Sequence, residues 1–137
     1  MSESRPGAPM PPEWFEAMVR QAPDALVFAD REGVIRVWSE GAERLFGHPA
    51  AVAVGASLDL IIPERFRAAH WAGYRRAMES GVARLGGRAM TTRSMHPDGR
   101  KLYVEMSFGL VRDALGQVVG SLAMARDCTE RELARRG

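Results

Sequence analysis

Apolar and polar residues alternate most regularly in the last third of the chain. In RKLYVEMSFGLV (residues 100–111) every second position is apolar, which is typical of a strand with one buried face. These apolar positions are Leu102, Val104, Met106, Phe108 and Leu110. The turn sequences HPDG and RDALGQ flank this stretch, so we predict an antiparallel meander of strands over residues 82–95, 100–111 and 118–127.

The N-terminal half contains short β-rich and helical stretches. Residues 26–29 and 34–38 are rich in β-forming side chains and are separated by DREG, which predicts a hairpin with Gly33 at its turn. EGAERLFG (residues 40–47) predicts a short helix that ends at its glycine. Residues 48–62 then predict short helical turns.

Further helices are predicted before the meander, after it and near the N-terminus. The longest covers residues 63–80, because Pro63 suits a first helical turn and Gly81 favours a helix end. The charged tail CTERELARRG (residues 128–137) is also helical in pattern. EWFEAMVRQA (residues 13–22) predicts an amphipathic helix, with apolar residues at Trp14, Phe15, Met18 and Val19.

Together these elements predict an α+β fold: a five-stranded antiparallel sheet with helices on one side and an N-terminal flanking helix. We divide the chain into a disordered tail (1–10), the flanking helix (11–22), the main domain (23–128) and an exit helix (129–137).

Composition narrows the class of function. The chain has 137 residues, 46% hydrophobic and 26% charged, with a formal net charge of +2, and its basic residues are dispersed. Nucleic-acid binding and membrane insertion are therefore not expected, and no sequence motif of an enzyme is found. The single cysteine, Cys128, excludes an internal disulfide and suits a reducing compartment. Without a signal-peptide pattern, we expect a cytoplasmic location.

His70 is the residue of greatest chemical interest. On an ideal helix it shares one face with Phe66, Gly73 and Ala77, all within an arc of about 60°, whereas Trp71 and Met78 form a flanking stripe. We expect the His70 face to point inward. A glycine inside a helix costs roughly 1 kcal/mol relative to alanine, so Gly73 suggests that space is kept beside the imidazole. His70 is either a polar core residue or a ligand.

Motifs across most of the chain resemble those of PAS domains. GVIRVWSEGAERLFGH resembles the opening of the domain, HPDGRKLYVEMSFGLVRD its strand–turn–strand, and GSLAMARDCTERE its last strand and exit motif. The resemblance spans roughly residues 22–131. One position departs from the family, which usually has Asn after the Trp, where this chain has Ser39.

IIPERFRAAHWAGYRR further resembles the helix of haem-binding PAS sensors of the FixL and Dos types. In those proteins the His of a Pro-led Arg-x-x-His helix is the proximal iron ligand, which implies that role for His70. The implied cofactor is haem b and the implied partner a diatomic gas (O2, CO or NO), or a change of redox state. Arg76 and Arg84 match basic positions that pair with a haem propionate.

The resemblance also implies a distal pocket. Where oxygen-sensing relatives have an Arg that hydrogen-bonds the gas, this chain has Met90, and where one branch has an iron-ligating Met it has Arg88. Positions two apart share one face of a strand, so an inward Arg88 is a candidate donor to the gas and Met90 a candidate axial ligand. Met106 and Phe108 match the family's apolar wall.

Alternatives remain open. The alternative is a haem-free PAS module for dimerisation or interaction, empty or holding another small molecule such as a flavin near Trp38. The cysteine of light-sensing flavin domains is missing, and Cys128 is expected to be a small buried thiol. His48 and His96 are expected to be exposed and without a role. We also predict a homodimer through Trp14, Phe15 and Met18, and an effector domain or partner protein is possible.

Overall fold

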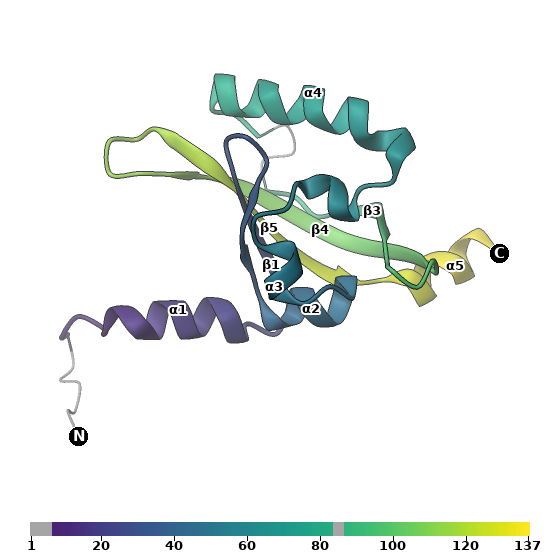
Figure 1. Cartoon of the computed structure of the whole chain (residues 1–137), viewed down its shortest axis with the longest axis horizontal. Coiled ribbons are helices and arrows are strands. Elements are labelled where there is room, and N and C mark those ends of the chain that lie inside the picture. The colour runs from purple at the N-terminus through teal and green to yellow at the C-terminus, as the bar shows by residue number, and fades with distance from the viewer. Residues whose placement is uncertain (1–6, 84–86) are drawn as a thin grey trace.

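The computed structural model describes residues 7–83 and 87–137. The predicted tail (1–10) therefore falls largely outside the described residues, as does Arg84. The elements follow the predicted order along the chain (Figure 1). They are α1 (Pro12–Gln21), β1 (Ala25–Asp30), β2 (Ile35–Trp38), α2 (Glu40–Phe46), α3 (Ala50–Ala53), the 3-10 helix η1 (Leu58–Ile61), α4 (Glu64–Ser80), β3 (Met90–Met95), β4 (Lys101–Arg112), β5 (Val118–Asp127) and α5 (Thr129–Arg136).

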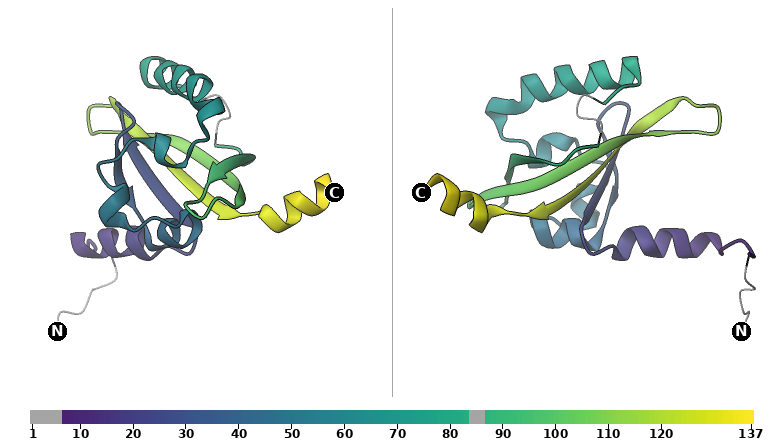
Figure 2. Two further views of the ribbon diagram at one scale, coloured as in Figure 1. Left: turned by 45° about the vertical axis from the view of Figure 1, so that its right-hand side comes forward. Right: turned by 180° about the vertical axis from the view of Figure 1, so that it is seen from behind.

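The strands form one antiparallel sheet in the order β2-β1-β5-β4-β3, which confirms the predicted fold class. Helices α2, α3, η1 and α4 contribute side chains to one core with the inner face of this sheet. The most deeply buried large side chains are Phe46, Ile35, Leu102 and Val104. In both views of Figure 2, α1 and α5 project from opposite ends of the domain.

Strand β4 buries the predicted positions Leu102 and Val104, and also Tyr103 between them, so its burial does not strictly alternate. Met106 lies between Met90 of β3 and Ala125 of β5, both on the inner face. Towards the β4–β5 hairpin the inner face becomes half-buried, at Phe108 and beyond. The core therefore fills one end of the sheet more completely than the other.

The hairpin turn between β1 and β2 needs its glycine for two reasons. Gly33 has a φ of +79°, a backbone conformation that side chains with a Cβ disfavour. A Cβ at this position would also lie 2.1 Å from Cη2 of Trp71 on α4. Gly33 thus sets the turn and lets α4 approach it.

Ser39, which stands where PAS domains usually have asparagine, links α2 to the sheet. Its Oγ accepts hydrogen bonds from the backbone N–H of Ala42, which caps α2, and from that of Leu26 in β1. A serine hydroxyl is among the preferred N-cap acceptors. The side chain is 1% exposed, so it joins α2 to the sheet inside the core.

No helix among the described residues is long and apolar enough to cross a membrane.

Candidate functional site

Helix α4 presents a different face to the domain from the one predicted. Phe66, expected to point inward with His70, is 42% exposed, whereas Met78 is only 5% exposed. The inward residues are Trp71, Tyr74 and Met78, at helical spacing. These side chains are larger than those of the predicted face, and the indole N–H of Trp71 and the hydroxyl of Tyr74 make hydrogen bonds. The helix is therefore rotated about its axis by roughly one residue position from the predicted orientation.

Polar contacts hold α4 onto the domain at three points along its length. Midway along the helix, Trp71 Nε1 donates to Asp59 Oδ1 of η1 at 2.8 Å. About one turn later, the Tyr74 hydroxyl reaches the carbonyl oxygens of Asp30 and Ala29 at the end of β1. At its end, the Arg112 guanidinium donates to the carbonyl of Gly81. Through these contacts α4 meets η1, β1 and β4.

His70 lies beside this inward stripe and is half-buried. Its ring packs edge-on against Trp71, with 4.7 Å between ring centroids, and at a tilt against Tyr74, at 5.7 Å. Nδ1 is buried and has no hydrogen-bond partner among the described residues. Burial lowers the pKa of His70, and the nearby charge of Asp59 partly opposes this. The imidazole is therefore neutral at pH 7, the protonation state in which histidine binds metals.

The three apolar residues predicted for the distal pocket lie on two neighbouring strands, β3 and β4. Met90 of β3 pairs with Met106 of β4 and is 40% exposed. Phe108 lies two residues further along β4, half-buried and opposite Ala123 of β5. The sheet thus brings Met90, Met106 and Phe108 together on its inner face, and leaves this part of the face incompletely covered.

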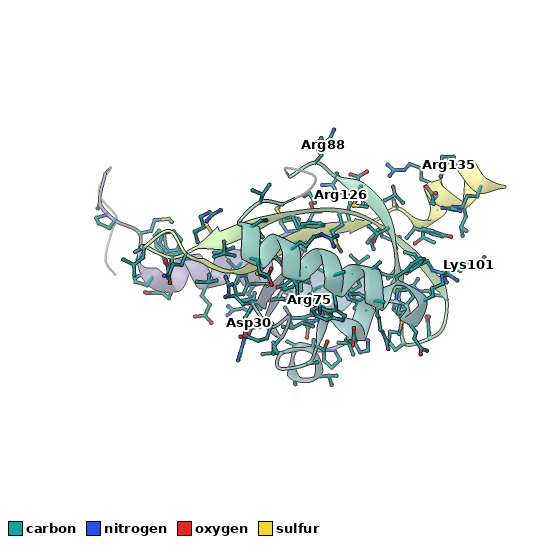
Figure 3. The ribbon with its side chains drawn as sticks, turned by 90° about the horizontal axis from the view of Figure 1, so that it is seen from above. Asp30, Arg75, Arg88, Lys101, Arg126 and Arg135 are labelled. Atoms are coloured by element: carbon teal, nitrogen blue, oxygen red, sulfur yellow. The ribbon has the colours of Figure 1, made fainter. Side chains whose placement is uncertain are left out.

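The two predicted cationic residues that the structure describes, Arg76 and Arg88, are on the surface. Arg76 is exposed on α4, one turn from Gly73. Arg88 is exposed too, and in Figure 3 its side chain extends away from the body of the molecule. Arg84 lies outside the described residues.

Two histidines expected to be exposed are instead partly buried at a cleft. His48 and His96 line a cleft of about 360 Å³. The other residues that line it are Asp59, Leu60, Arg67, Met95 and Pro97. Burial and the neighbouring charge of His96 lower the pKa of His48. Gly47 leaves room for His96 beside this cleft, since a Cβ there would lie 2.5 Å from His96 Nε2, but the sequence carries no local signal that the two histidines meet.

Trp38 and Cys128 are core residues. Trp38 is 5% exposed, stacks on Phe46 and donates its indole N–H to the carbonyl of His48. Cys128 is 7% exposed at the junction of β5 and α5. Among the described residues no group of three or more His, Cys, Asp or Glu could hold a metal ion. Haem iron, by contrast, takes its axial ligand from a single side chain.

The exit motif fixes the start of α5 to β4. Thr129 Oγ1 accepts from the N–H of Tyr103 at 2.9 Å and lies 3.2 Å from the carbonyl oxygen of the same residue. The Asp127 carboxylate accepts from the N–H of Thr129. At the far end of α5, about two turns on, Arg136 lies over the Tyr103 ring. The position of α5 therefore depends on a strand that also lines the inner face.

Helix α1 leaves its apolar side chains uncovered. Trp14, Phe15 and Met18 are 45%, 54% and 51% exposed, and no residue of the helix is buried. An apolar groove of about 510 Å³ runs beside the helix, lined by Met10, Trp14, Ala17, Met18, Gln21, Ala22 and Pro23.

The profile of the PAS fold family matches residues 19–133. This chain belongs to the PAS family. It is 26% identical over 118 residues to the sensor protein FixL of Bradyrhizobium diazoefficiens, a match that covers 86% of this chain and 23% of FixL. It is 28% identical over 116 residues to the oxygen sensor protein DosP of Escherichia coli, covering 85% of this chain and 14% of DosP. The PAS chain therefore spans less than a quarter of the length of these curated relatives.

The fold has the same architecture as solved PAS domains. The crystal structure of the PAS domain of a protein from Colwellia psychrerythraea superposes with a TM-score of 0.74 at 24% identity, covering 87% of this chain and 98% of that one. PAS domains are signalling modules, and this chain is one of them.

Proposed function

We propose that this PAS domain binds haem b through His70 and senses a diatomic gas or a change of redox state. The observation that carries the proposal is the state of the imidazole: it is half-buried and neutral at pH 7, and its buried Nδ1 makes no hydrogen bond to a described residue. The ring is thus not tied into the core by a hydrogen bond at Nδ1, and Nε2 would be the nitrogen that takes the iron. A hydrogen-bonded core histidine, the competing interpretation, would have used that nitrogen. The similarity to FixL and DosP supports the same assignment.

The residues present fit such a group. His70 would hold the iron, and the incompletely covered inner face at Met106 and Phe108 would supply an apolar wall. Arg76, and Arg84 outside the described residues, would pair with the propionates. Haem, when bound, supplies an iron centre that takes a diatomic gas or changes oxidation state.

On the distal side, we propose that Arg88 would donate to the gas and that Met90 would be a soft ligand to the iron. Arg88 is exposed, so its role requires the residues before β3 to turn inward. Met90 already lies on the inner face, opposite Met106. Arg88→Ala is expected to change the dissociation rate of oxygen from the ferrous protein, and Met90→Ala its ferrous spectrum. An unchanged dissociation rate shows that Arg88 is not the donor, and an unchanged ferrous spectrum shows that Met90 is not a ligand.

An absorption spectrum of the purified protein, before and after addition of hemin, tests the central proposal. We expect a strong Soret band that His70→Ala abolishes. His48→Ala and His96→Ala are matched controls, because both residues are partly buried histidines that line another cleft, and these variants should retain the band. A protein that stays colourless with hemin is a haem-free interaction module, the alternative function.

We also propose that the domain works as a homodimer through α1. The uncovered Trp14, Phe15 and Met18 support this, because a 10-residue helix is marginal without packing. Replacing all three by alanine should convert a dimer to a monomer when mass is measured in solution. Val52 and Val54, which are 54% and 46% exposed elsewhere, provide the control pair for alanine substitution. A triple variant that remains fully dimeric contradicts the assignment.

A further inference from the structure

We propose that Asp59 is a positioning residue for His70 and that it acts through the indole of Trp71. Its importance for function rests on the proposed role of His70 as the haem ligand. The contacts that support it belong to this chain alone, so they can be tested with or without haem.

Asp59 is itself held in place from two sides. Its backbone N–H donates to Ser57 Oγ, which caps η1, at 3.1 Å. Arg67 donates to the carbonyl oxygens of Asp59 and Ile62, and its Nε lies 3.8 Å from Asp59 Oδ1. The carboxylate is thus presented to α4 from a fixed turn.

The Trp71 indole is fixed at both of its ends. Its Nε1 donates to Asp59 Oδ1 at 2.8 Å. At its far end, Cη2 and Cζ3 lie against the α-carbon of Gly33, where a Cβ would come within 2.1 and 2.2 Å of them. The glycine leaves room for the ring, and the carboxylate fixes its rotation.

His70 takes its orientation from this indole. The two rings meet edge-on with an interplanar angle of 75°, and Tyr74, anchored through its hydroxyl to β1, packs on the imidazole from a second direction. A ligating histidine is ordinarily oriented by a hydrogen bond from its second ring nitrogen. Here Nδ1 has no such partner among the described residues, and Asp59, the nearby carboxylate, bonds to Trp71 instead. Aromatic packing takes the place of that hydrogen bond.

The test compares Asp59→Ala, Asp59→Asn, Trp71→Phe and the double variant Asp59→Ala/Trp71→Phe. Asparagine keeps an oxygen that can accept from the indole, and phenylalanine keeps a ring but has no N–H donor. Asp98→Ala is the matched control, because Asp98 pairs with His96 and Arg100. Far-UV circular dichroism of each variant establishes that it is folded.

The first measurement needs no haem. In NMR spectra, we expect Asp59→Ala to weaken the nuclear Overhauser contacts between the His70 and Trp71 rings, whereas Asp59→Asn and Asp98→Ala preserve them. The second measurement is a hemin titration. Loss of a group that orients a metal ligand costs about 10-fold to 100-fold in affinity, so Asp59→Ala and Trp71→Phe should each weaken hemin binding by about tenfold or more. Because both act through one contact, the double variant should be no weaker than the worse single variant.

Three results overturn the proposal: ring contacts unchanged in Asp59→Ala, Asp59→Asn as damaging as Asp59→Ala, or additive losses in the double variant. If the unmodified protein binds no hemin, the proposed function fails, and the ring contacts in the haem-free protein still decide whether Asp59 positions His70.

Discussion

Replacing Ser39 by alanine removes one acceptor from two backbone donors inside the core. Ser39 Oγ accepts from Leu26 N–H at 2.9 Å and from Ala42 N–H at 3.2 Å, and Ser39, Leu26 and Ala42 are all buried. Alanine cannot replace these bonds, and water does not reach the site. The change therefore leaves one strand donor and one helix-cap donor without the acceptor they have in the native structure.

The two losses can be estimated separately. A buried donor left unsatisfied costs about 1–3 kcal/mol, and loss of an N-cap side chain costs about 0.5–2 kcal/mol. We therefore expect Ser39→Ala to reduce the free energy of unfolding by roughly 2–4 kcal/mol, a large part of the 5–15 kcal/mol typical of a native domain. Ser39→Asn, which restores the usual PAS residue and an acceptor oxygen, should lose less.

Urea unfolding followed by circular dichroism measures this loss as a lower midpoint at an unchanged slope. Ser57→Ala is the control, because Ser57 Oγ caps η1 through a single exposed contact with the N–H of Asp59. That variant should lose roughly 0.5–1 kcal/mol. If Ser39→Ala is no more destabilised than Ser57→Ala, the reasoning about buried donors at this junction is wrong.

Three further predictions concern the contacts around α4 and the histidines. Gly33→Ala should destabilise by about 1–2 kcal/mol for its positive φ and by a further 1–3 kcal/mol or so for the clash with Trp71. Gly116→Ala, at φ +82° with no atom near its Cβ, should show the first cost alone, and equal losses would exclude the clash. Tyr74→Phe should cost about 0.5–1.5 kcal/mol and speed hydrogen exchange in α4; unchanged exchange would show that the hydroxyl does not hold the helix. Because burial lowers the pKa of His48 and of His70, the unfolded chain binds more protons below about pH 6.5. Stability should be complete above that pH and fall as the pH drops below it, and a His48→Gln/His70→Gln variant should show a shallower fall in acid-denaturation curves.

The order and type of the elements could be predicted from the sequence because their signals are local. Alternation along β4, the glycine-containing turn between β1 and β2, and the glycines that end α2 and α4 each depend on a few neighbouring residues. PAS motifs spread along the whole chain then restricted the topology. The fold class and the family were therefore accessible before any contact between distant residues was known.

Which face of α4 points inward could not be predicted in this way. Helical spacing defined two stripes, one with Phe66 and His70 and one with Trp71 and Met78, but the choice between them depends on partners elsewhere. Asp59 on η1 accepts from Trp71, and Gly33 on the β1–β2 turn makes room for its ring. Only the tertiary structure places these groups together, because they are 12 and 38 residues away from Trp71 along the chain.

Contacts between residues far apart in the sequence also explain which features of the site could be predicted and which were missed. The sequence alone selected His70, from its helix and its PAS resemblance, and paired Met106 with Phe108 from that resemblance and their spacing on one strand. It could not show that the Nδ1 atom of His70 is buried without a partner, or that His48 and His96 line one cleft. Burial and the lack of a partner are properties of all the surrounding elements at once. A sequence specifies which side chains are available for such a site, and packing determines which of them meet and which are left to bind something else.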